Sequence, residues 1–303
     1  MVTVSKKGEW FELTIPKKWA GQSATQLFRE IWGAPKKLTH QMRMEGCVKK
    51  NNNPIVWEKP LIQGDRLQFK LLTDPQVETL ENDGFYTDVD VRYEDDHLII
   101  FNKPAGMETH PHTLVQKNTL LDAAKYYMQL QGESTYIRHI HRLDKETSGV
   151  ILFAKHSLAG AILDTELAQR SIKRTYMALV HGQLKNKHDS IELPIGKDRH
   201  HSNKRRVSTT GQYAKTTYDV QAYDSKKNIS LITCQLDTGR THQIRVHLSH
   251  IGHPLVGDHL YGGKNLLTRQ ALHAYKLEWQ HPFTKEKQEI TCPAPADFRS
   301  LCP

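Results

Sequence analysis

The chain is poor in cysteine and in long apolar runs, and these two absences exclude several classes of protein. Its 303 residues include 4 cysteines, with no C-x-x-C pair, which argues against a zinc ribbon or a redox motif and predicts free thiols in a reducing cytosol. No stretch approaches the roughly eighteen apolar residues of a membrane span. The first residues, MVTVSKKGEWFELTIPKKW, lack the apolar core of a signal peptide. We therefore expect a cytoplasmic protein that does not enter a membrane.

Acidic residues are fewer than basic ones. The chain has 33 Asp and Glu against 42 Lys and Arg, for a formal net charge of +9. An excess of this size favours a polyanionic partner. Nucleic acid is the leading candidate and an anionic membrane surface the second. Charge alone does not identify the partner, because many basic proteins bind neither.

Histidine is plentiful, but metal-ligand spacing is missing. The 18 histidines include HPH at 110–112, HIH at 139–141 and HH at 200–201. None of these has a spacing such as H-E-x-x-H, and a catalytic zinc ion needs a defined set of three protein ligands. We therefore expect no functional metal ion.

The length allows about two domains. WFELTIP, at 10–16, alternates apolar and polar residues like a half-buried strand, and the segment from 23 to 72 has the pattern of a compact small module. The polar stretch TDPQVETLENDG at 73–84 is typical of a linker. The sequence thus predicts an N-terminal module at 1–75, a linker at 76–87 and a larger domain at 88–303.

Strands dominate the larger domain, and helices intervene irregularly. We predict strands near 89–93 and 98–102, and further strands at TYMALVHG and SLITCQL. Helices are expected at 157–170, with Ser157 as N-cap, and at THQIRVHLSHIG, ending at Gly252. This pattern favours an α+β domain with a mixed, largely antiparallel sheet.

The stretch HRLDKETSGVILFAK, at 141–155, places Asp144 on a loop before an apolar strand. Rigid scaffolds often present catalytic groups on such loops. The alternative is a turn-capping aspartate paired with the neighbouring Arg142. Further along, KRTYMALVHG places Tyr176 on a strand face with Ala178 and Val180, where it is either functional or a sheet-packing residue.

A third segment, LDTGRTHQIRVHLSHIGHPLVGDHLYGG, places several basic residues at a corner between a strand, a loop and a helix. Helical spacing predicts a buried stripe of Ile244, His247 or Leu248, and Ile251, which leaves Arg245 beside its edge. An arginine in that position needs an anion. The same corner carries Arg240 and His242.

Together the three segments resemble the RluA-type family of pseudouridine synthases. The first family motif, HRLD-x-x-T-S-G, is matched from His141 to Gly149, the second by KRTYMALVHG, and the third by TGRTHQIRVHL continuing into GHPLVGDHLYG. The likeness covers roughly residues 88–298, and the order and spacing of the motifs are intact. Three ordered motifs of this length are far more specific than a single HRLD.

The resemblance implies isomerisation of a uridine within RNA to pseudouridine, without a metal ion or an organic cofactor. It assigns the catalytic aspartate to Asp144, the active-site tyrosine to Tyr176 and the basic partner of the aspartate to Arg245. Arg142 matches the position that enters the RNA stack as the target base swings out. His141, Thr147, Arg240 and His242 are then candidate substrate contacts, although His141 and His242 also suit structural roles.

These residue types fit the chemistry. A carboxylate can act as a nucleophile or stabilise an electron-poor sugar at a glycosidic centre. A nearby guanidinium keeps it ionised where burial alone would raise its pKa. A tyrosine offers a flat face for uracil, and a base within a helix must be extruded to reach the carboxylate. Attack on C1′ and deprotonation of the sugar both remain open.

GKDRHHSNKRR, at 196–206, is a basic segment with a single acidic residue. It is either a solvated loop or a phosphate-contacting one, and an RNA substrate favours the second. The expected phosphate contacts are Lys197, Lys204, Arg205 and Arg206.

The region 20–72 resembles the S4 RNA-binding module in its second half, EGCVKKNNNPI followed by IQGDRLQF. Its first half lacks the usual serine-arginine pair, so folding as an S4-like unit is better supported than RNA binding by it. We expect a monomer whose partner is structured ribosomal or transfer RNA. The rival hypotheses are an inactive RNA-binding or RNA-chaperone protein and a metal-dependent nuclease.

Overall fold

The structure is a computed structural model that describes residues 2–72, 88–113, 115–132 and 136–303. Its N-terminal part is built on a five-stranded sheet in the order β1-β2-β5-β3-β4. The alternation in WFELT buries Phe11 and Leu13 on one face of β2, as the sequence predicts. The strands are β1 Val4–Lys7, β2 Trp10–Thr14, β3 Val48–Lys50, β4 Asn53–Pro54 and β5 Arg66–Lys70.

The helices of this part pack on one face of the small sheet. Ser23 begins the first of them with a capping box. The Ser23 hydroxyl accepts from the Gln26 N–H, and the Gln26 side chain accepts from the Ser23 N–H. The helical elements are the turn Lys17–Trp19, α1 Ala24–Gln26, a π-helical turn Leu27–Ile31, and α2 Lys36–Met44. The segment that begins at residue 23 therefore opens with helical structure.

The rest of the chain is organised by a ten-stranded sheet in the order β11-β14-β15-β10-β16-β9-β7-β6, with β17 beside β16 and β8 beside β9. All of its pairings are antiparallel except that of β16 with β9, so the predicted α+β fold with a largely antiparallel sheet is confirmed. The strands are β6 Val91–Glu94, β7 Leu98–Lys103, β8 Arg138–His139, β9 Ser148–Ala154, β10 Lys173–His181, β11 His188–Glu192, β14 Lys215–Asp224, β15 Ile229–Leu236, β16 Leu272–Gln280 and β17 Lys287–Thr291; β12 Ile195–Lys197 and β13 Arg205–Val207 form a separate hairpin.

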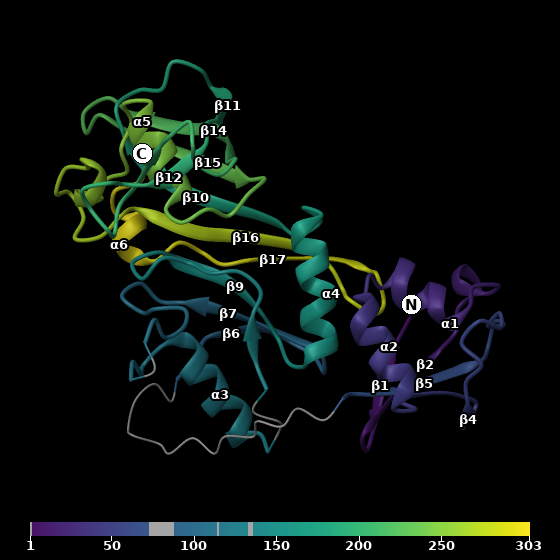
Figure 1. Cartoon of the computed structure of the whole chain (residues 1–303). Coiled ribbons are helices and arrows are strands. Elements are labelled where there is room, and N and C mark those ends of the chain that lie inside the picture. The colour runs from purple at the N-terminus through teal and green to yellow at the C-terminus, as the bar shows by residue number, and fades with distance from the viewer. Residues whose placement is uncertain (1, 73–87, 114, 133–135) are drawn as a thin grey trace.

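The helices of this part are α3 Leu120–Leu130, α4 Ser157–Ala168, α5 Gln243–His250 and α6 Ala296–Arg299, with a 3-10 turn at His259–Tyr261. Figure 1 shows α3 near β6 and β7 at one edge of this sheet, α5 near β14 toward the other edge, and α4 beside the central strands. The predicted N-cap of α4 is wrong by one residue, because His156 caps the helix through Nδ1, which accepts from the Ala159 N–H at 3.2 Å. The predicted end of α5 is confirmed: the C-cap residue is followed by Gly252 in the left-handed conformation.

The buried face of α5 is wider than predicted. Residues 243–248 are all buried, including Arg245, whereas Ile251 is 37% exposed. A helix surrounded by strands and loops at its first turns has no solvent-facing side there. The predicted burial of Ile244, His247 and Leu248 is confirmed, whereas the expected burial of Ile251 and the place of Arg245 at the edge of the stripe are wrong.

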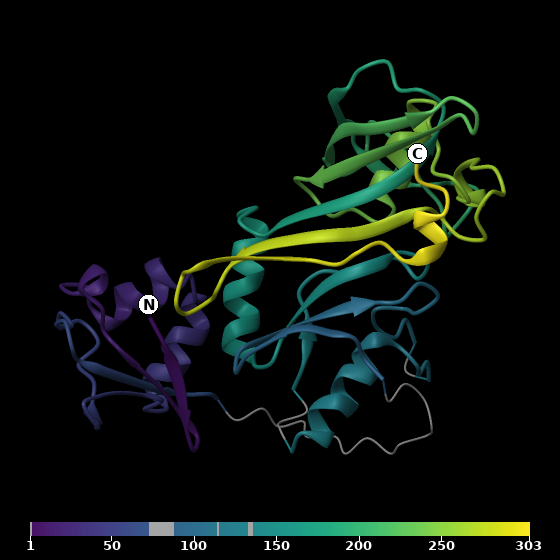
Figure 2. The ribbon, with the colours of Figure 1, turned by 180° about the vertical axis from the view of Figure 1, so that it is seen from behind.

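The N-terminal part packs against α4 and the turn between β16 and β17, as both ribbon views show (Figures 1 and 2). Phe69 stacks on Phe283 at 5.2 Å between ring centroids, and the Trp32 indole N–H donates to the Phe283 carbonyl at 3.1 Å. Lys285 Nζ donates to the Trp32 carbonyl at 3.2 Å and to Glu166 at 2.6 Å. One apolar core therefore continues through both sheets.

The predicted linker at 76–87 lies outside the described residues, as do 73–75 of the predicted module, so the boundaries 1–75 and 88–303 stay predictions. Within the described part of the chain, no helix combines the length and apolarity needed to cross a membrane.

We predict that stability falls as the pH drops below 6.5. At the junction of the two sheets, His97 Nδ1 lies 3.0 Å from His156 Nε2, and burial lowers the pKa of His97 from 6.5 to about 3 despite the nearby Asp95. Between those values only the unfolded chain gains the proton. Stability is therefore complete above 6.5 and decreases below it, by about 1.4 kcal/mol per pH unit for this histidine.

Urea unfolding between about pH 7 and pH 5 measures this effect. In His97→Phe, the pH dependence should be shallower than in the unmodified protein. A free energy of unfolding that is constant over this range would contradict the prediction.

Candidate active site

Asp144 lies in the loop 141–147, which leads from β8 into β9. The loop closes on itself, because the Thr147 N–H donates to the Asp144 carbonyl over 3.0 Å. Thr109 holds it from the side: its hydroxyl donates to the Leu143 carbonyl at 3.0 Å and accepts from the Leu143 N–H at 3.2 Å. The carboxylate therefore sits on a fixed loop, with 20% of its side chain exposed.

A buried lysine supports the same loop from behind. Lys103 is fully buried, and its ammonium group donates to the carbonyls of Pro104, Met107 and Lys145 at 2.8, 2.7 and 2.9 Å. Burial lowers the pKa of Lys103 to about 7, although the charge of Asp144 opposes this. Two further hydrogen bonds reach the loop from the segment before β16: Arg269 donates to the Glu146 carbonyl at 3.1 Å, and Gln270 to Thr147 Oγ1 at 3.3 Å.

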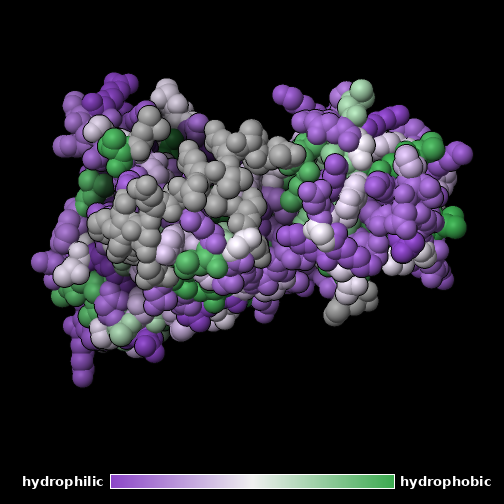
Figure 3. All heavy atoms as spheres, turned by 90° about the horizontal axis from the view of Figure 1, so that it is seen from below, coloured by the Kyte–Doolittle hydropathy of each residue, from purple (hydrophilic) through white to green (hydrophobic). Residues whose placement is uncertain are grey.

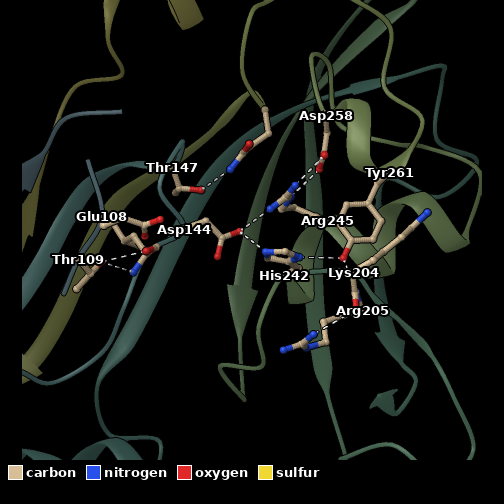
Figure 4. A network of polar contacts seen from close by, with 12 residues as sticks. Glu108, Thr109, Asp144, Thr147, Lys204, Arg205, His242, Arg245, Asp258 and Tyr261 are labelled. Carbon is tan, nitrogen blue, oxygen red and sulfur yellow. Dashed lines mark hydrogen bonds and ion pairs between the residues drawn. The ribbon is translucent and has the colours of Figure 1, made fainter. Parts of the chain in front are cut away.

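The carboxylate of Asp144 forms an ion pair with Arg245 of α5, shown in Figure 4. Arg245 NH1 donates to Asp144 Oδ2 at 3.0 Å. The other side of the guanidinium binds Asp258, with Nε to Oδ2 at 2.7 Å and NH2 to Oδ1 at 2.9 Å. Because Asp258 takes two of the three nitrogens in a bidentate pair, the remaining one is directed at Asp144.

The carboxylates of this cluster stabilise the charged form of Arg245. Burial lowers the pKa of Arg245, but the hydrogen bonds of Asp258 and the charges of Asp144 and Asp258 outweigh it and hold the pKa above its ordinary value. Asp258 has 1% of its side chain exposed. The site is therefore a carboxylate–guanidinium–carboxylate array in which Asp144 alone faces open space.

A second set of contacts surrounds Asp144 on the side of Tyr261. His242 Nε2 lies 3.8 Å from Asp144 Oδ2, and His242 Nδ1 lies 2.9 Å from Tyr261 Oη. The same Tyr261 oxygen accepts from the Arg205 N–H at 2.9 Å. Lys204 Nζ lies 5.4 Å from the Tyr261 ring centroid. Burial lowers the pKa of His242 and raises that of Tyr261 to about 12, so both groups are neutral near pH 7.

A cavity of about 600 Å³ opens beside the carboxylate. Tyr176, on β10, lies in its wall with 5% of the residue exposed. Burial raises the pKa of this phenol, which keeps it protonated at neutral pH. The predicted trio of Asp144, Tyr176 and Arg245 therefore lines one cavity large enough for a nucleobase, although the three residues come from three separate segments.

The other predicted residues on the wall of this cavity are His141, Arg142, Thr147, Arg240 and His242. Arg142 is exposed and makes no hydrogen bond or ion pair with the described residues, whereas the Arg240 guanidinium donates to the Tyr213 carbonyl at 3.0 Å. His141 is buried, its Nε2 accepts from the Leu152 N–H at 3.3 Å, and burial lowers its pKa to about 3. That histidine is a neutral acceptor that fixes the loop.

The predicted basic segment forms the β12–β13 hairpin. Lys204 and Arg205 lie beside Tyr261, where the connecting loop of the hairpin meets β13, while Lys197 and Arg206 are exposed on its strands. None of these four side chains lines the cavity. Among the described residues, no group of three or more His, Cys, Asp and Glu side chains is placed to hold a metal ion.

Asp258, Tyr261 and Lys103 were not predicted from the sequence as residues of the site. Asp258 and Tyr261 belong to the stretch GHPLVGDHLYGG, where an aspartate and a tyrosine three residues apart follow the arginine helix. That spacing was a usable signal. Lys103 gave none, because its partners are main-chain carbonyls.

Two family models match the chain. One, described as RNA pseudouridylate synthase, matches residues 97–250, and the other, described as RluD ribosomal pseudouridine synthase N-terminal domain, matches residues 11–67. The first spans the loop of Asp144, Tyr176 and Arg245. The second lies within the predicted N-terminal module and does not test its likeness to the S4 module.

Individual relatives agree with these matches. The protein named Uncharacterized RNA pseudouridine synthase YhcT, from Bacillus subtilis (strain 168), is 42% identical over 300 residues, which are 99% of this chain and 98% of the relative. Ribosomal large subunit pseudouridine synthase D of Nitrosomonas europaea is 33% identical over 96% of this chain and 86% of its own length. The structure of Human RNA Pseudouridylate Synthase Domain Containing 1 superposes with a TM-score of 0.57 at 25% identity, covering 69% of this chain and 84% of that one.

We predict that Asp258→Asn destabilises the protein strongly. The change leaves the buried Arg245 with a neutral partner, and breaking one member of a buried ion pair costs about 3–5 kcal/mol. Urea unfolding measures it. The control is Asp164→Asn, whose pair with Arg138 at 2.8 Å is 48% and 39% exposed and should contribute less than about 1 kcal/mol. Equal losses in the two variants would contradict the prediction.

Proposed function

Because the chain belongs to the family of RNA pseudouridine synthases and is therefore an isomerase, we propose that it converts a specific uridine of structured RNA to pseudouridine with Asp144 as the catalytic carboxylate. The main support is the ion pair of Asp144 with Arg245, which turns one charged carboxylate toward a cavity of nucleobase size. Among the basic groups beside Asp144, Arg245 holds its carboxylate in place.

The reaction breaks the C1′–N1 bond, turns the uracil while it is still bound, and joins C5 to C1′. N1 gains a proton and C5 loses one, so the product is an isomer and no co-reactant is needed. The carboxylate of Asp144 acts either by attack on C1′ or by deprotonation of the sugar, and both routes require it to be ionised. The Arg245 guanidinium at 3.0 Å favours that state and fixes the carboxylate's orientation.

Tyr176 is the proposed support for the uracil. Its ring lies in the cavity wall, and its protonated phenol can donate a hydrogen bond to the base as it turns. Thr147 and His141 also line the cavity and hold the Asp144 loop, and His242 offers a neutral ring beside the carboxylate.

The target base must leave its helix to reach Asp144, at a cost of a few kcal/mol for unstacking. Arg142 is two residues before Asp144, exposed, and without a hydrogen bond or ion pair to the described residues. We propose that it enters the space that the base leaves. Arg240, which also lines the cavity, is a second candidate contact to the RNA strand.

Ribosomal RNA of the large subunit is the proposed substrate. The support is the name of the relatives from Nitrosomonas europaea and Neisseria meningitidis, Ribosomal large subunit pseudouridine synthase D, which are 33% and 34% identical to this chain. Transfer RNA is the alternative outcome. Mapping pseudouridines in all RNA of a strain that lacks the protein separates the two.

We also propose that the protein works as a cytoplasmic monomer, without a metal ion or organic cofactor, and that its N-terminal module folds as an S4-like unit. The face in Figure 3 is mostly hydrophilic, with hydrophobic residues in small separate groups. The exposed large apolar side chains include Met44, Ile62 and Leu266. Scattered apolar residues are normal for a monomer, whereas interfaces need contiguous patches.

We predict that Asp144→Asn abolishes conversion and leaves RNA binding near normal, because the amide has the same shape but cannot carry the negative charge. The assay measures pseudouridine formed in large-subunit ribosomal RNA transcribed in vitro, with purified protein and no added metal. Asp237→Asn, which changes another carboxylate on the cavity wall, is the control and should keep most of the turnover.

Substantial turnover in Asp144→Asn would refute the role of Asp144. Binding without any conversion by the unmodified protein, on ribosomal or transfer RNA, would favour an inactive RNA-binding protein. Cleavage of the RNA that a chelator abolishes would favour a metal-dependent nuclease.

A second prediction concerns the β12–β13 hairpin. Replacing Lys204, Arg205 and Arg206 together by Ala should weaken RNA binding and lower the slope of log affinity against log salt by about 0.7 for each phosphate that is no longer neutralised. The hydrogen bond from the Arg205 N–H to Tyr261 Oη is retained, because its donor belongs to the main chain. The control is Lys226→Ala with Lys227→Ala, in the turn between β14 and β15. Unchanged affinity at low and high salt would contradict the prediction.

A further inference from the structure

One guanidinium in the active-site cavity has no partner among the described residues. Arg174, on β10, is 9% exposed, its Nε is buried without a hydrogen bond, and it forms no ion pair within the described part of the chain. The other buried or half-buried arginines on this wall each have one: Arg245 is held by Asp144 and Asp258, and Arg138 by Asp164.

A buried charge without a partner destabilises a folded protein, because its lost hydration is not replaced. Neighbouring groups do not neutralise Arg174. His141 and Tyr176 both feel its charge, and burial keeps each of them uncharged near pH 7. Asp237, on the same cavity wall, pairs with Arg170 at 3.8 Å. This end of the cavity therefore carries an uncompensated positive charge that a bound anion would balance.

The local structure leaves space for such an anion. Arg174 and Tyr176 are two residues apart on one strand and both buried, so they share a face of the sheet about 6.6 Å apart along it. Gly239 lies against the guanidinium: a Cβ atom at that position would lie 2.9 Å from Arg174 NH1. A side chain at 239 would crowd the guanidinium on the side that faces the cavity.

We propose that Arg174 binds a phosphodiester group of the RNA strand next to the flipped uridine. This inference rests on the proposed function, because it takes the occupant of the cavity to be a nucleotide whose base lies on Tyr176. The uracil is uncharged in the ground state, whereas the phosphate carries a full negative charge, and a guanidinium matches two phosphate oxygens in bidentate geometry. Arg174 thus anchors the backbone while Asp144 acts on the sugar.

The first test needs no turnover. Inorganic phosphate, compared with chloride at equal ionic strength, should raise the melting temperature of the unmodified protein more than that of Arg174→Met. The control is Lys173→Met, which removes the same charge from the exposed face of β10 and should respond like the unmodified protein. An equal response in all three proteins would overturn the proposal.

Arg174→Met in the absence of anions should also melt at the same or a higher temperature than the unmodified protein, because it removes an unpaired buried charge. If Arg174 served only to pack the fold, Arg174→Met would instead melt at a lower temperature. A markedly lower melting temperature, together with unchanged RNA binding, would therefore overturn the proposal.

The second test uses an RNA fragment that carries the uridine converted by the unmodified protein. Replacing the phosphate on either side of that uridine with an uncharged methylphosphonate should weaken binding about ten- to a hundredfold at one of the two positions. In Arg174→Met the same methylphosphonate replacement should not weaken RNA binding further. In Arg174→Lys it should still weaken binding, but less than in the unmodified protein. If the losses of affinity from the methylphosphonate and from Arg174→Met simply add at both positions, the proposed interaction is refuted. If Arg174→Met slows turnover but binds the RNA normally, Arg174 contacts the uracil instead.

The two tests separate the inference from the function on which it rests. If the unmodified protein converts no uridine but the phosphate response depends on Arg174, the proposed function fails and the anion site stands. If conversion occurs and neither test responds to Arg174, the inference alone fails.

Discussion

The candidate active site depends on one guanidinium shared by two carboxylates. Asp258 binds Arg245 through two nitrogens and leaves the third for Asp144 at 3.0 Å. A bidentate pair restricts rotation of the planar group, so Asp258 sets the direction from which Asp144 is held. Because Arg245 and Asp258 are both buried, water screens their attraction little, and the pair holds Asp144 at the wall of the cavity.

Much of the site was predictable from the sequence because its residues lie in distinct local patterns. The loop of Asp144 precedes an apolar run that folds as β9, and the alternation around Tyr176 buries it on β10. Strand and helix positions therefore follow from periodicity, as β2, β15 and α5 also illustrate. The convergence of Asp144, Tyr176 and Arg245 came from a family likeness and not from periodicity, which carries no information about distant contacts.

What the sequence did not predict depends on tertiary contacts. Arg245 is buried because α5 is enclosed on all sides at its start, and a helical pattern alone assigns it to an edge. Lys103 and Arg269 act on main-chain carbonyls of the Asp144 loop, which any residue type supplies. The β16 strand was missed as well, and its partners β9 and β10 come from distant parts of the chain.

The place of β16 has a mechanical consequence. It joins β9 and β7 to β10 and β15, and Gly149, at φ +114°, crosses it so closely that a Cβ atom would collide with the Ala274 backbone. Asp144 precedes β9 on one flank, and Arg245 follows β15 on the other. The ion pair therefore links two parts of the sheet that β16 holds together, and the separation of the carboxylate and the guanidinium depends on how this one strand aligns them.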